Sequence, residues 1–243
     1  MGIVRSSGSG WHRHNCQHSH YISQVGEAHA HIAAQPYIRA GLPRSGQPLN
    51  FTLGVLILMN MHLSALGISS ELITARGLRE CEEASTLEVA EVGADGRDHL
   101  LVPLAAKAWR FLKAAALVDG VDLFIVSAFR SIDRQAEIIR RKLETGAAVE
   151  NILTVCAPPG FSEHHTGRAV DLSTPNSRAL EAEFDQTAAY VWLTVHAAEF
   201  GYYISYPMGN PLGYQYEPWH WCFNDAQPIV QAGLPQKRGS PLT

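Results

Sequence analysis

The chain has 243 residues, of which 46% are apolar and 17% charged, and its formal net charge is −4. This length is sufficient for one large or two small hydrophobic cores, and the composition excludes a wholly disordered chain, a coiled coil and a collagen-like protein. Because no block of basic residues exists, we expect no nucleic-acid partner. The four cysteines form no CxxC pair, so the sequence specifies no disulfide.

The first 60 residues differ in composition from the rest of the chain. They contain four arginines and one acidic residue, a net charge of +3, whereas the following 183 residues carry −7. Half of the 12 histidines precede residue 32, and no helix or strand period is visible before residue 49. We interpret residues 1–60 as a poorly ordered extension, or as sequence that precedes a true start at Met59 or Met61. A third interpretation is a metal site in the histidine cluster.

Residues 51–58 form the most apolar run of the sequence. They are too few to span a bilayer, which takes about 20 apolar residues, so we expect no stable membrane span. A secretory signal can have an apolar core this short, but it would start some 50 residues into the chain and no A-x-A cleavage site follows. A small buried helix explains the run equally well, and the cellular location stays open.

From about residue 70 the hydrophobic pattern is that of a folded domain, with residues 61–243 assigned to it and a core at about 75–225. After Pro103, a helix is predicted from apolar residues at helical spacing, which are Leu104, Ala108, Phe111, Leu112 and Ala115. The other predicted elements are a strand at 121–126, a helix at 131–145 capped by Ser131, a strand at 168–172, a helix at 187–200 ended by Gly201, and strands at 202–206 and 219–223. This order of elements indicates an α+β fold with a mainly antiparallel sheet.

A first candidate metal motif runs from Ser162 to Asp171 and contains His164, with the sequence SEHHTGRAVD. Imidazole and carboxylate groups are both good zinc ligands. Gly167 permits a sharp turn between the loop that carries His164 and the strand that carries Asp171. From spacing alone, His165 is an alternative ligand to His164.

A second motif, Glu-Pro-Trp-His, places Glu217 three residues before His220. In a strand, His220 and Cys222 share one face, and we interpret Cys222 as a small buried side chain and not as a fourth ligand. His164, Asp171 and His220 would leave a fourth position open, which is the pattern of a catalytic zinc site. Glu217 would then serve as a general base.

The motifs S-x-H-x-x-G-x-A-x-D and E-P-W-H resemble those of the bacterial zinc D-alanyl-D-alanine carboxypeptidases. That family belongs to a superfamily with lysostaphin-type endopeptidases and the hedgehog domain. Upstream, the sequence Ser127-Ala-Phe-Arg130-Ser131-x-x-x-Gln135 is similar to the family motif S-G-Y-R-S-x-x-x-Q, with Ala128 and Phe129 in place of Gly and Tyr. The resemblance covers roughly residues 75–225.

The resemblance implies an antiparallel sheet that carries the metal, with helices packed on one side. It implies one Zn²⁺ per chain, held by His164, Asp171 and His220. Glu217 would be the catalytic base and Arg130 would stabilise the oxyanion. Substrate contacts would come from Ser127, Gln135 and Ser162. An ion pair with Asp133 or Glu137 is the alternative role for Arg130, and His165 and His196 are interpreted as structural.

The leading functional prediction is therefore a zinc carboxypeptidase that removes the C-terminal D-amino acid from peptidoglycan stem peptides. Such a substrate implies a place in the cell envelope. One alternative is an endopeptidase of the same superfamily, although the Glu-Pro-Trp-His form favours the carboxypeptidase branch. The other alternative is a binding module without catalysis, against which the presence of both Glu217 and Arg130 argues. The sequence leaves open the oligomeric state and the choice between D,D- and L,D-peptide bonds.

Overall fold

The computed structural model describes residues 59–225. The expectations for residues 1–58, among them the histidine cluster and the apolar run at 51–58, lie outside this range. Over the part of the chain that is described, no helix is long and apolar enough to cross a membrane.

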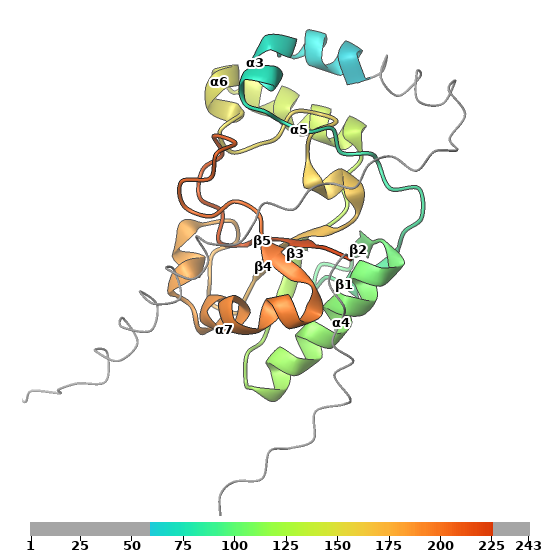
Figure 1. The fold of residues 1–243 in the computed structure, drawn as a ribbon, viewed down its shortest axis with the longest axis vertical. Coiled ribbons are helices and arrows are strands. Elements are labelled where there is room, and N and C mark those ends of the chain that lie inside the picture. Colours follow the sequence, from blue (N-terminus) through green and yellow to red (C-terminus); the bar gives the residue numbers. More distant parts are fainter. Residues whose placement is uncertain (1–58, 226–243) are drawn as a thin grey trace, which may run out of the picture. The chain divides into compact units, whose positions relative to one another are not determined.

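Helices and short strands are interspersed along the described chain (Figure 1). A helical segment at 59–65 comes first. The α-helices that follow are α3 (Ser70–Ala75), α4 (Pro103–Val118), α5 (Ile132–Glu144), α6 (Val149–Ile152) and α7 (Ala188–His196). The 3₁₀ helices are η1 (Glu163–Thr166), η2 (Ala182–Gln186) and η3 (Ala197–Phe200). The strands are β1 (Glu88–Val92), β2 (Asp98–Leu101), β3 (Phe124–Ser127), β4 (Ala169–Ser173), β5 (Tyr202–Ile204) and β6 (His220–Phe223).

The central sheet has four strands in the order β3-β4-β6-β5, and every pair is antiparallel. In its register, Ser127 lies opposite Asp171, and Asp171 lies opposite His220. Three residues of the predicted motifs therefore lie side by side across three strands. The antiparallel α+β fold expected from the sequence is confirmed.

Helices α4 and α7 lie on one side of this sheet, and α3, α5 and α6 lie on the other (Figure 1). Helices therefore cover both sides of the sheet, and not one side as the resemblance implied. The hydroxyl of Tyr202 on β5 donates to the carbonyl of Ala105 on α4 at 2.9 Å. The Tyr190 ring on α7 meets Trp221 on β6 with centroids 6.4 Å apart. The second group of helices has its own apolar cluster of buried side chains, which are Met59, Leu63, Leu66, Ile68, Ile73, Ala136, Ile139, Ile152, Leu153, Cys156 and Phe161.

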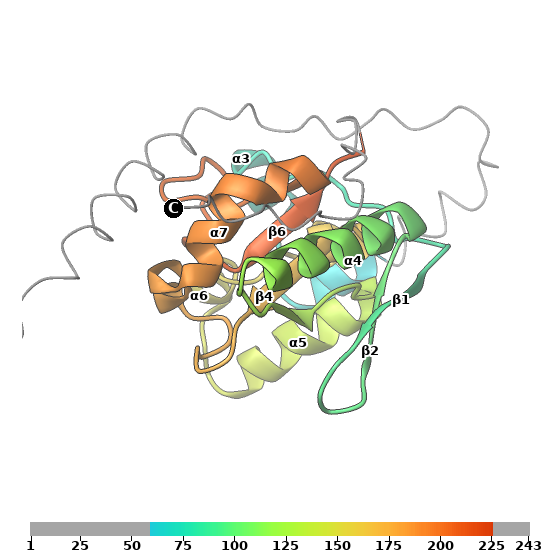
Figure 2. The ribbon, with the colours of Figure 1, turned by 90° about the horizontal axis from the view of Figure 1, so that it is seen from below.

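The β1–β2 hairpin packs along α4 (Figure 2), and the sequence analysis did not predict it. Glu91 of β1 holds it in place. Its Oε2 accepts hydrogen bonds from Trp109 Nε1 at 3.0 Å and from Lys113 Nζ at 2.9 Å, and its Oε1 accepts one from the backbone N–H of Ile125 at 3.2 Å. One partly buried carboxylate thus joins the hairpin, α4 and β3.

The predicted ends of two helices are confirmed. Ser131 caps α5, where its Oγ accepts from the N–H of Arg134 at 3.1 Å. Gly201 follows η3 with a φ of +79°. The predicted helix at 187–200 is divided into α7 and η3, and the strand predicted at 121–126 begins later, at Phe124.

The apolar stripe predicted for α4 was wrong in part, because two of its large members face outward. Leu104 is 52% exposed and Phe111 is 41% exposed. The buried face is instead made mainly of small residues, which are Ala105, Ala106, Ala108, Trp109, Leu112 and Ala116. Of the large apolar residues in the predicted stripe, only Leu112 lies on the buried face, where the small alanines allow close packing of the helix.

Candidate metal centre and active site

Three buried side chains from three elements converge on one point. His164 comes from η1, Asp171 from β4 and His220 from β6. Each offers one ligand atom, and these atoms all lie within 4.8 Å of one another. Their exposed fractions are 2%, 5% and 2%, respectively. The structure therefore brings together the three residues that the sequence motifs singled out as metal ligands.

Local backbone geometry explains how the first two residues meet. Gly167 ends η1 with a φ of +63°, a conformation that L-residues with a side chain rarely adopt. A Cβ at this position would also lie only 2.8 Å from Cδ2 of Leu87. The resulting turn leads the chain from His164 directly into β4, which carries Asp171.

The two adjacent histidines have different surroundings. His164 Nδ1 lies 2.6 Å from the carbonyl oxygen of Ala128, so this nitrogen donates and Nε2 faces the carboxylate of Asp171, with Oδ2 at 3.1 Å. His165 instead uses both ring nitrogens on the backbone, with Nδ1 2.6 Å from the Arg130 carbonyl and Nε2 accepting from the N–H of Gly160 at 3.1 Å. His164, and not His165, is the histidine of the cluster.

His220 is held by two carboxylates. Its Nδ1 lies 2.9 Å from Oδ1 of Asp171, and its Nε2 lies 3.0 Å from Oε2 of Glu163. The sequence reasoning did not assign a role to Glu163, although this residue stands between Ser162 and His164 in the motif. A carboxylate on the outer nitrogen of a metal-binding histidine fixes the ring and makes it a better ligand.

The electrostatics of the cluster are those of a site that accepts a cation. Burial, together with the charge of Arg130, lowers the pKa of His164 to about 4, so this ring is neutral at pH 7. Burial opposes a charge on His220 as well, but its hydrogen bonds to Asp171 and Glu163 prevail and raise its pKa to about 10. Burial also opposes the charge of Asp171, yet the two histidines hold the pKa of this carboxyl well below its usual range.

The donor set suits zinc, which takes imidazole nitrogen and carboxylate oxygen ligands. In each imidazole, one ring nitrogen faces Asp171 and the other forms a hydrogen bond to a group outside the cluster, as in many metal sites. Cys222 is not part of the cluster among the described residues, and its Sγ lies 4.0 Å from the carbonyl oxygen of Phe223. Zinc binding would displace the proton that His220 carries.

Glu217 enters the site from the segment before β6. Its backbone N–H donates to the Tyr206 carbonyl at 3.1 Å, and its own carbonyl accepts from the N–H of His220, also at 3.1 Å. Burial raises the pKa of Glu217 to about 7, and the negative charge of Asp171 contributes to the shift, while His220 and Arg130 oppose it. A carboxyl group with this pKa can both accept and return a proton near neutrality.

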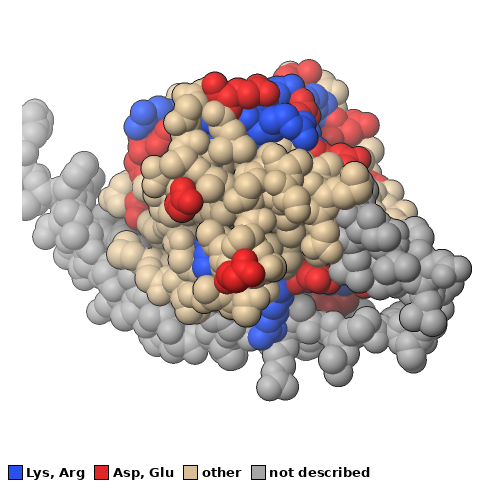
Figure 3. All heavy atoms as spheres, turned by 90° about the horizontal axis from the view of Figure 1, so that it is seen from above, with Lys and Arg blue, Asp and Glu red and all other residues tan. Residues whose placement is uncertain are grey.

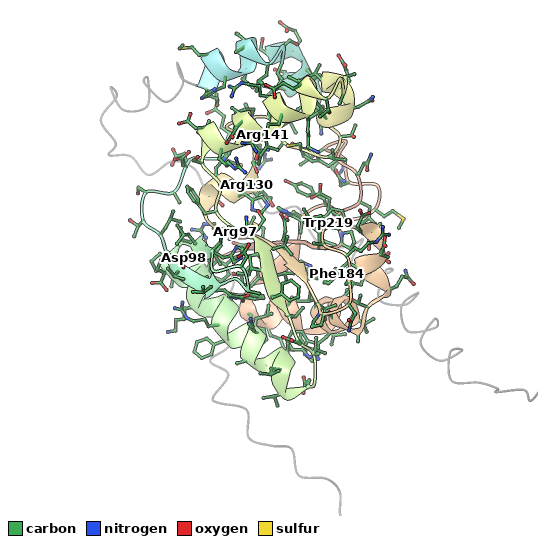
Figure 4. The ribbon with its side chains drawn as sticks, turned by 180° about the vertical axis from the view of Figure 1, so that it is seen from behind. Arg97, Asp98, Arg130, Arg141, Phe184 and Trp219 are labelled. Carbon is green, nitrogen blue, oxygen red and sulfur yellow. The ribbon has the colours of Figure 1, made fainter. Side chains whose placement is uncertain are left out.

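Arg130 lies between α5 and the central sheet (Figure 4). Its Nε atom is buried and has no hydrogen-bond partner in the described protein. The alternative role for Arg130 was an ion pair with Asp133 or Glu137. In the structure, Asp133 pairs with His62 instead, and Glu137 pairs with Arg134 and Arg141. The guanidinium group is therefore available to a ligand of the site.

The expected substrate contacts lie around the same cluster. Ser127 stands opposite Asp171 in the sheet, and Ser162 is 3% exposed. Gln135 is fully buried on α5, where its Nε2 donates to the Ala157 carbonyl at 2.7 Å and its Oε1 has no hydrogen-bond partner within residues 59–225. Ser127 and Ser162 are therefore neighbours of the cluster in the sheet and along the chain, whereas Gln135 contacts the segment that precedes Ser162.

The fold and site define a class of protein in which an antiparallel sheet carries a candidate metal centre, and comparisons with known proteins identify the family. Residues 98–226 match the family VanY, described as D-alanyl-D-alanine carboxypeptidase. The match covers more than half of the sequence, and the chain belongs to this family.

Individual relatives agree with that assignment. Putative carboxypeptidase YodJ of Bacillus subtilis is 36% identical over 119 residues, which are 48% of this chain and 43% of the relative. A D-alanyl-D-alanine carboxypeptidase of Enterococcus faecalis is 31% identical over 119 residues, 45% of this chain and 42% of the relative. The solved structure of the LdcB LD-carboxypeptidase is similar with a TM-score of 0.53 and 32% identity, over 58% of this chain and 69% of that one. The chain thus spans less than half the length of the two relatives matched by sequence.

Proposed function

We propose that this chain is a zinc-dependent carboxypeptidase that removes the C-terminal D-amino acid from peptidoglycan stem peptides. One observation carries the proposal: a partly buried carboxyl group, Glu217, interacts electrostatically with Asp171 and His220, two of the three buried side chains that could hold a single metal ion. A site that only held a structural zinc ion would need neither this group nor Arg130, whose buried Nε has no hydrogen-bond partner among the described residues.

His164, Asp171 and His220 would bind one Zn²⁺ per chain. When bound, the ion would supply a Lewis acid that polarises the scissile carbonyl and makes a water molecule more acidic. The roles of these three residues agree with the orientation of their rings and carboxylate in the cluster.

The protein's own groups account for the proton transfers. Glu217 would take a proton from the attacking water and pass it to the leaving amine, which its pKa near neutrality allows. Arg130 stays cationic at any working pH, so its guanidinium could stabilise the negative charge that develops on the carbonyl oxygen. Ser127, Gln135 and Ser162 would contact the substrate.

The direct test is incubation of the purified chain with two muropeptides, a pentapeptide ending in D-Ala-D-Ala and the corresponding tetrapeptide, followed by mass spectrometry. Loss of one residue from the pentapeptide identifies a D,D-carboxypeptidase. Loss of one residue from the tetrapeptide identifies an L,D-carboxypeptidase, an activity that the likeness to LdcB favours. Internal cleavage would indicate an endopeptidase, and an unchanged substrate would favour a binding module.

The Glu217→Gln variant tests the assignment of the base. Glutamine keeps the volume of the side chain but cannot accept the proton, so turnover should fall by roughly 10²–10⁴-fold. Zinc content should stay equal to that of the unmodified protein. Loss of zinc would make Glu217 a ligand, and full turnover would assign the proton transfer to another group.

A further inference from the structure

Arg76 stands at the C-terminal end of α3, upstream of the residues that match the family. Its Nε donates to the carbonyl of Leu212 at 2.8 Å, and its Nη1 donates to the carbonyl of Leu153 at 2.7 Å. Its guanidinium also lies over the ring of Tyr214, with Cζ 4.4 Å from the centroid. One side chain therefore contacts two loops that are far apart in the sequence.

The first of these loops carries the candidate base. Residues 207–217, here called the Glu217 loop, contain no helix or strand. Residues 207–216 also contain no Lys, Arg, Asp or Glu. The view from above shows a broad surface with few charged side chains, most of which lie along its upper edge and a smaller number at its lower edge (Figure 3). Charge-assisted contacts to this loop must therefore come from outside it.

The second loop follows α6 and provides the other half of the contact. Besides the Leu153 carbonyl that Arg76 binds, the Thr154 carbonyl accepts from the N–H of Gln215 at 2.8 Å. Arg76 and this turn thus hold the Glu217 loop at Leu212 and Gln215, respectively. Because the peptide bonds of a loop lack the regular hydrogen bonds of a helix or sheet, few contacts of this kind decide where it lies.

A line of aromatic contacts extends from Arg76 to the metal cluster. Tyr214, beneath the guanidinium, meets the ring of Tyr206 with centroids 4.8 Å apart. Tyr206 in turn meets the ring of His220 at 4.7 Å, and its carbonyl accepts the N–H of Glu217. The position of Arg76 is therefore connected by direct packing to a candidate ligand and to the candidate base.

We propose that Arg76 is a positioning residue that holds the Glu217 loop in the conformation in which Glu217 faces the metal cluster. The effect of this positioning on catalysis rests on the proposed function. Arginine suits this task because its planar group binds two carbonyls and stacks on a ring at once, whereas the ammonium of lysine is a single compact charge. A misplacement of about 1 Å at a catalytic group can cost about 100-fold in rate.

The test compares the full chain with Arg76→Ala, Arg76→Lys and a matched control, Arg79→Ala, whose exposed side chain lies three residues away. Hydrogen exchange measured by mass spectrometry should show faster exchange in residues 207–217 of Arg76→Ala and unchanged exchange in β4 and β6. Turnover per bound zinc should fall by roughly 10–100-fold with KM changed less than about threefold. In both readouts, Arg76→Lys should lie between Arg76→Ala and the unmodified protein, and Arg79→Ala should match the unmodified protein.

Wild-type exchange in the Glu217 loop of Arg76→Ala would overturn the proposal. So would equally faster exchange throughout the sheet, because that result describes general destabilisation, and so would turnover per zinc equal to that of Arg79→Ala. If Arg76→Ala does not fold, the same two measurements on Arg76→Lys decide whether the proposal stands. If the unmodified chain cleaves neither muropeptide, the proposed function fails, while the exchange measurement still tests the contact.

Discussion

Nε2 of His220 lies 3.0 Å from Oε2 of Glu163, on the side of the imidazole opposite to the metal cluster. The hydrogen bond fixes which ring nitrogen faces Asp171. Carboxylates in this position typically change metal affinity by about 10–100-fold when they are removed.

We therefore expect Glu163→Ala to weaken zinc binding by about 10–100-fold, measured by competition with a chromophoric chelator. Glu163→Gln can still accept the hydrogen bond from Nε2 but lacks the charge, so its loss should be smaller. Equal affinity of Glu163→Ala and the unmodified protein would show that the ring is held in place by its packing alone.

The three candidate ligands should differ sharply from a histidine outside the cluster. His164→Ala, Asp171→Ala and His220→Ala should each lose most bound zinc, as measured by metal analysis after dialysis, because three protein ligands leave no redundancy. His196→Ala is the matched control, since His196 pairs with Glu199 outside the cluster. Full zinc content in any of the three variants would remove that residue from the ligand set.

Gly167 should be sensitive to the smallest possible substitution. Gly167→Ala would place a Cβ at a φ of +63° and 2.8 Å from Leu87. Strained backbone of this kind costs roughly 1–3 kcal/mol, so the midpoint of urea unfolding should fall. Gly146→Ala, which has a positive φ of +86° but no atom within 4 Å of its Cβ, separates the cost of φ from that of the clash. Equal midpoints for the two variants would show that the clash contributes nothing.

The candidate site could be predicted from the sequence to a large extent because its residues lie in short local motifs. Residues 162–171 and 217–220 carry their spacing with them, and the strand period already places Asp171 and His220 on defined faces. Glu163 is part of the same motif, but its hydrogen bond depends on the pairing of β4 with β6. That pairing joins residues about 50 positions apart, and no local pattern encodes it.

Other features could not be predicted because tertiary contacts decide them. The contacts of Arg76 form only when α3 packs beside two distant loops. The β1–β2 hairpin is stabilised by Glu91, whose charge gives no strand signal. On α4, the outward position of Leu104 and Phe111 reflects the close approach that its alanines permit, which hydrophobicity alone does not reveal.

The segment before α3 should be essential for stability. Met59, Leu63, Leu66 and Ile68 belong to the buried cluster around α5 and α6. Burial of each such side chain contributes roughly 1.5–3 kcal/mol before the cost of ordering the segment. A chain that starts at Ser69 should therefore unfold at a much lower temperature than one that starts at Met59. Equal melting temperatures would mean that the cluster does not depend on this segment.

The raised pKa of Glu217 predicts how the metal-free protein responds to pH. The pKa is about 7 in the folded protein, against an ordinary value of 4.5 for a glutamate side chain. Between these values the folded state keeps a proton that the unfolded state releases, so stability falls as pH rises from 4.5 to 7. Above pH 7 the side chain of Glu217 is ionised in both states, and the folded state bears the full free-energy cost of burying that charge.

Glu217→Gln removes that cost, so the chelated variant should be more stable than the chelated unmodified protein at pH 8 and nearly equal to it at pH 4.5. A gain of about 1–2 kcal/mol is expected, since partial exposure of the side chain reduces the full value of the shift. Urea unfolding of both proteins at the two pH values provides the measurement. A gain of the same size at pH 4.5 would assign the effect to packing or hydrogen bonding of the amide, and no gain at pH 8 would show that water already solvates the carboxylate.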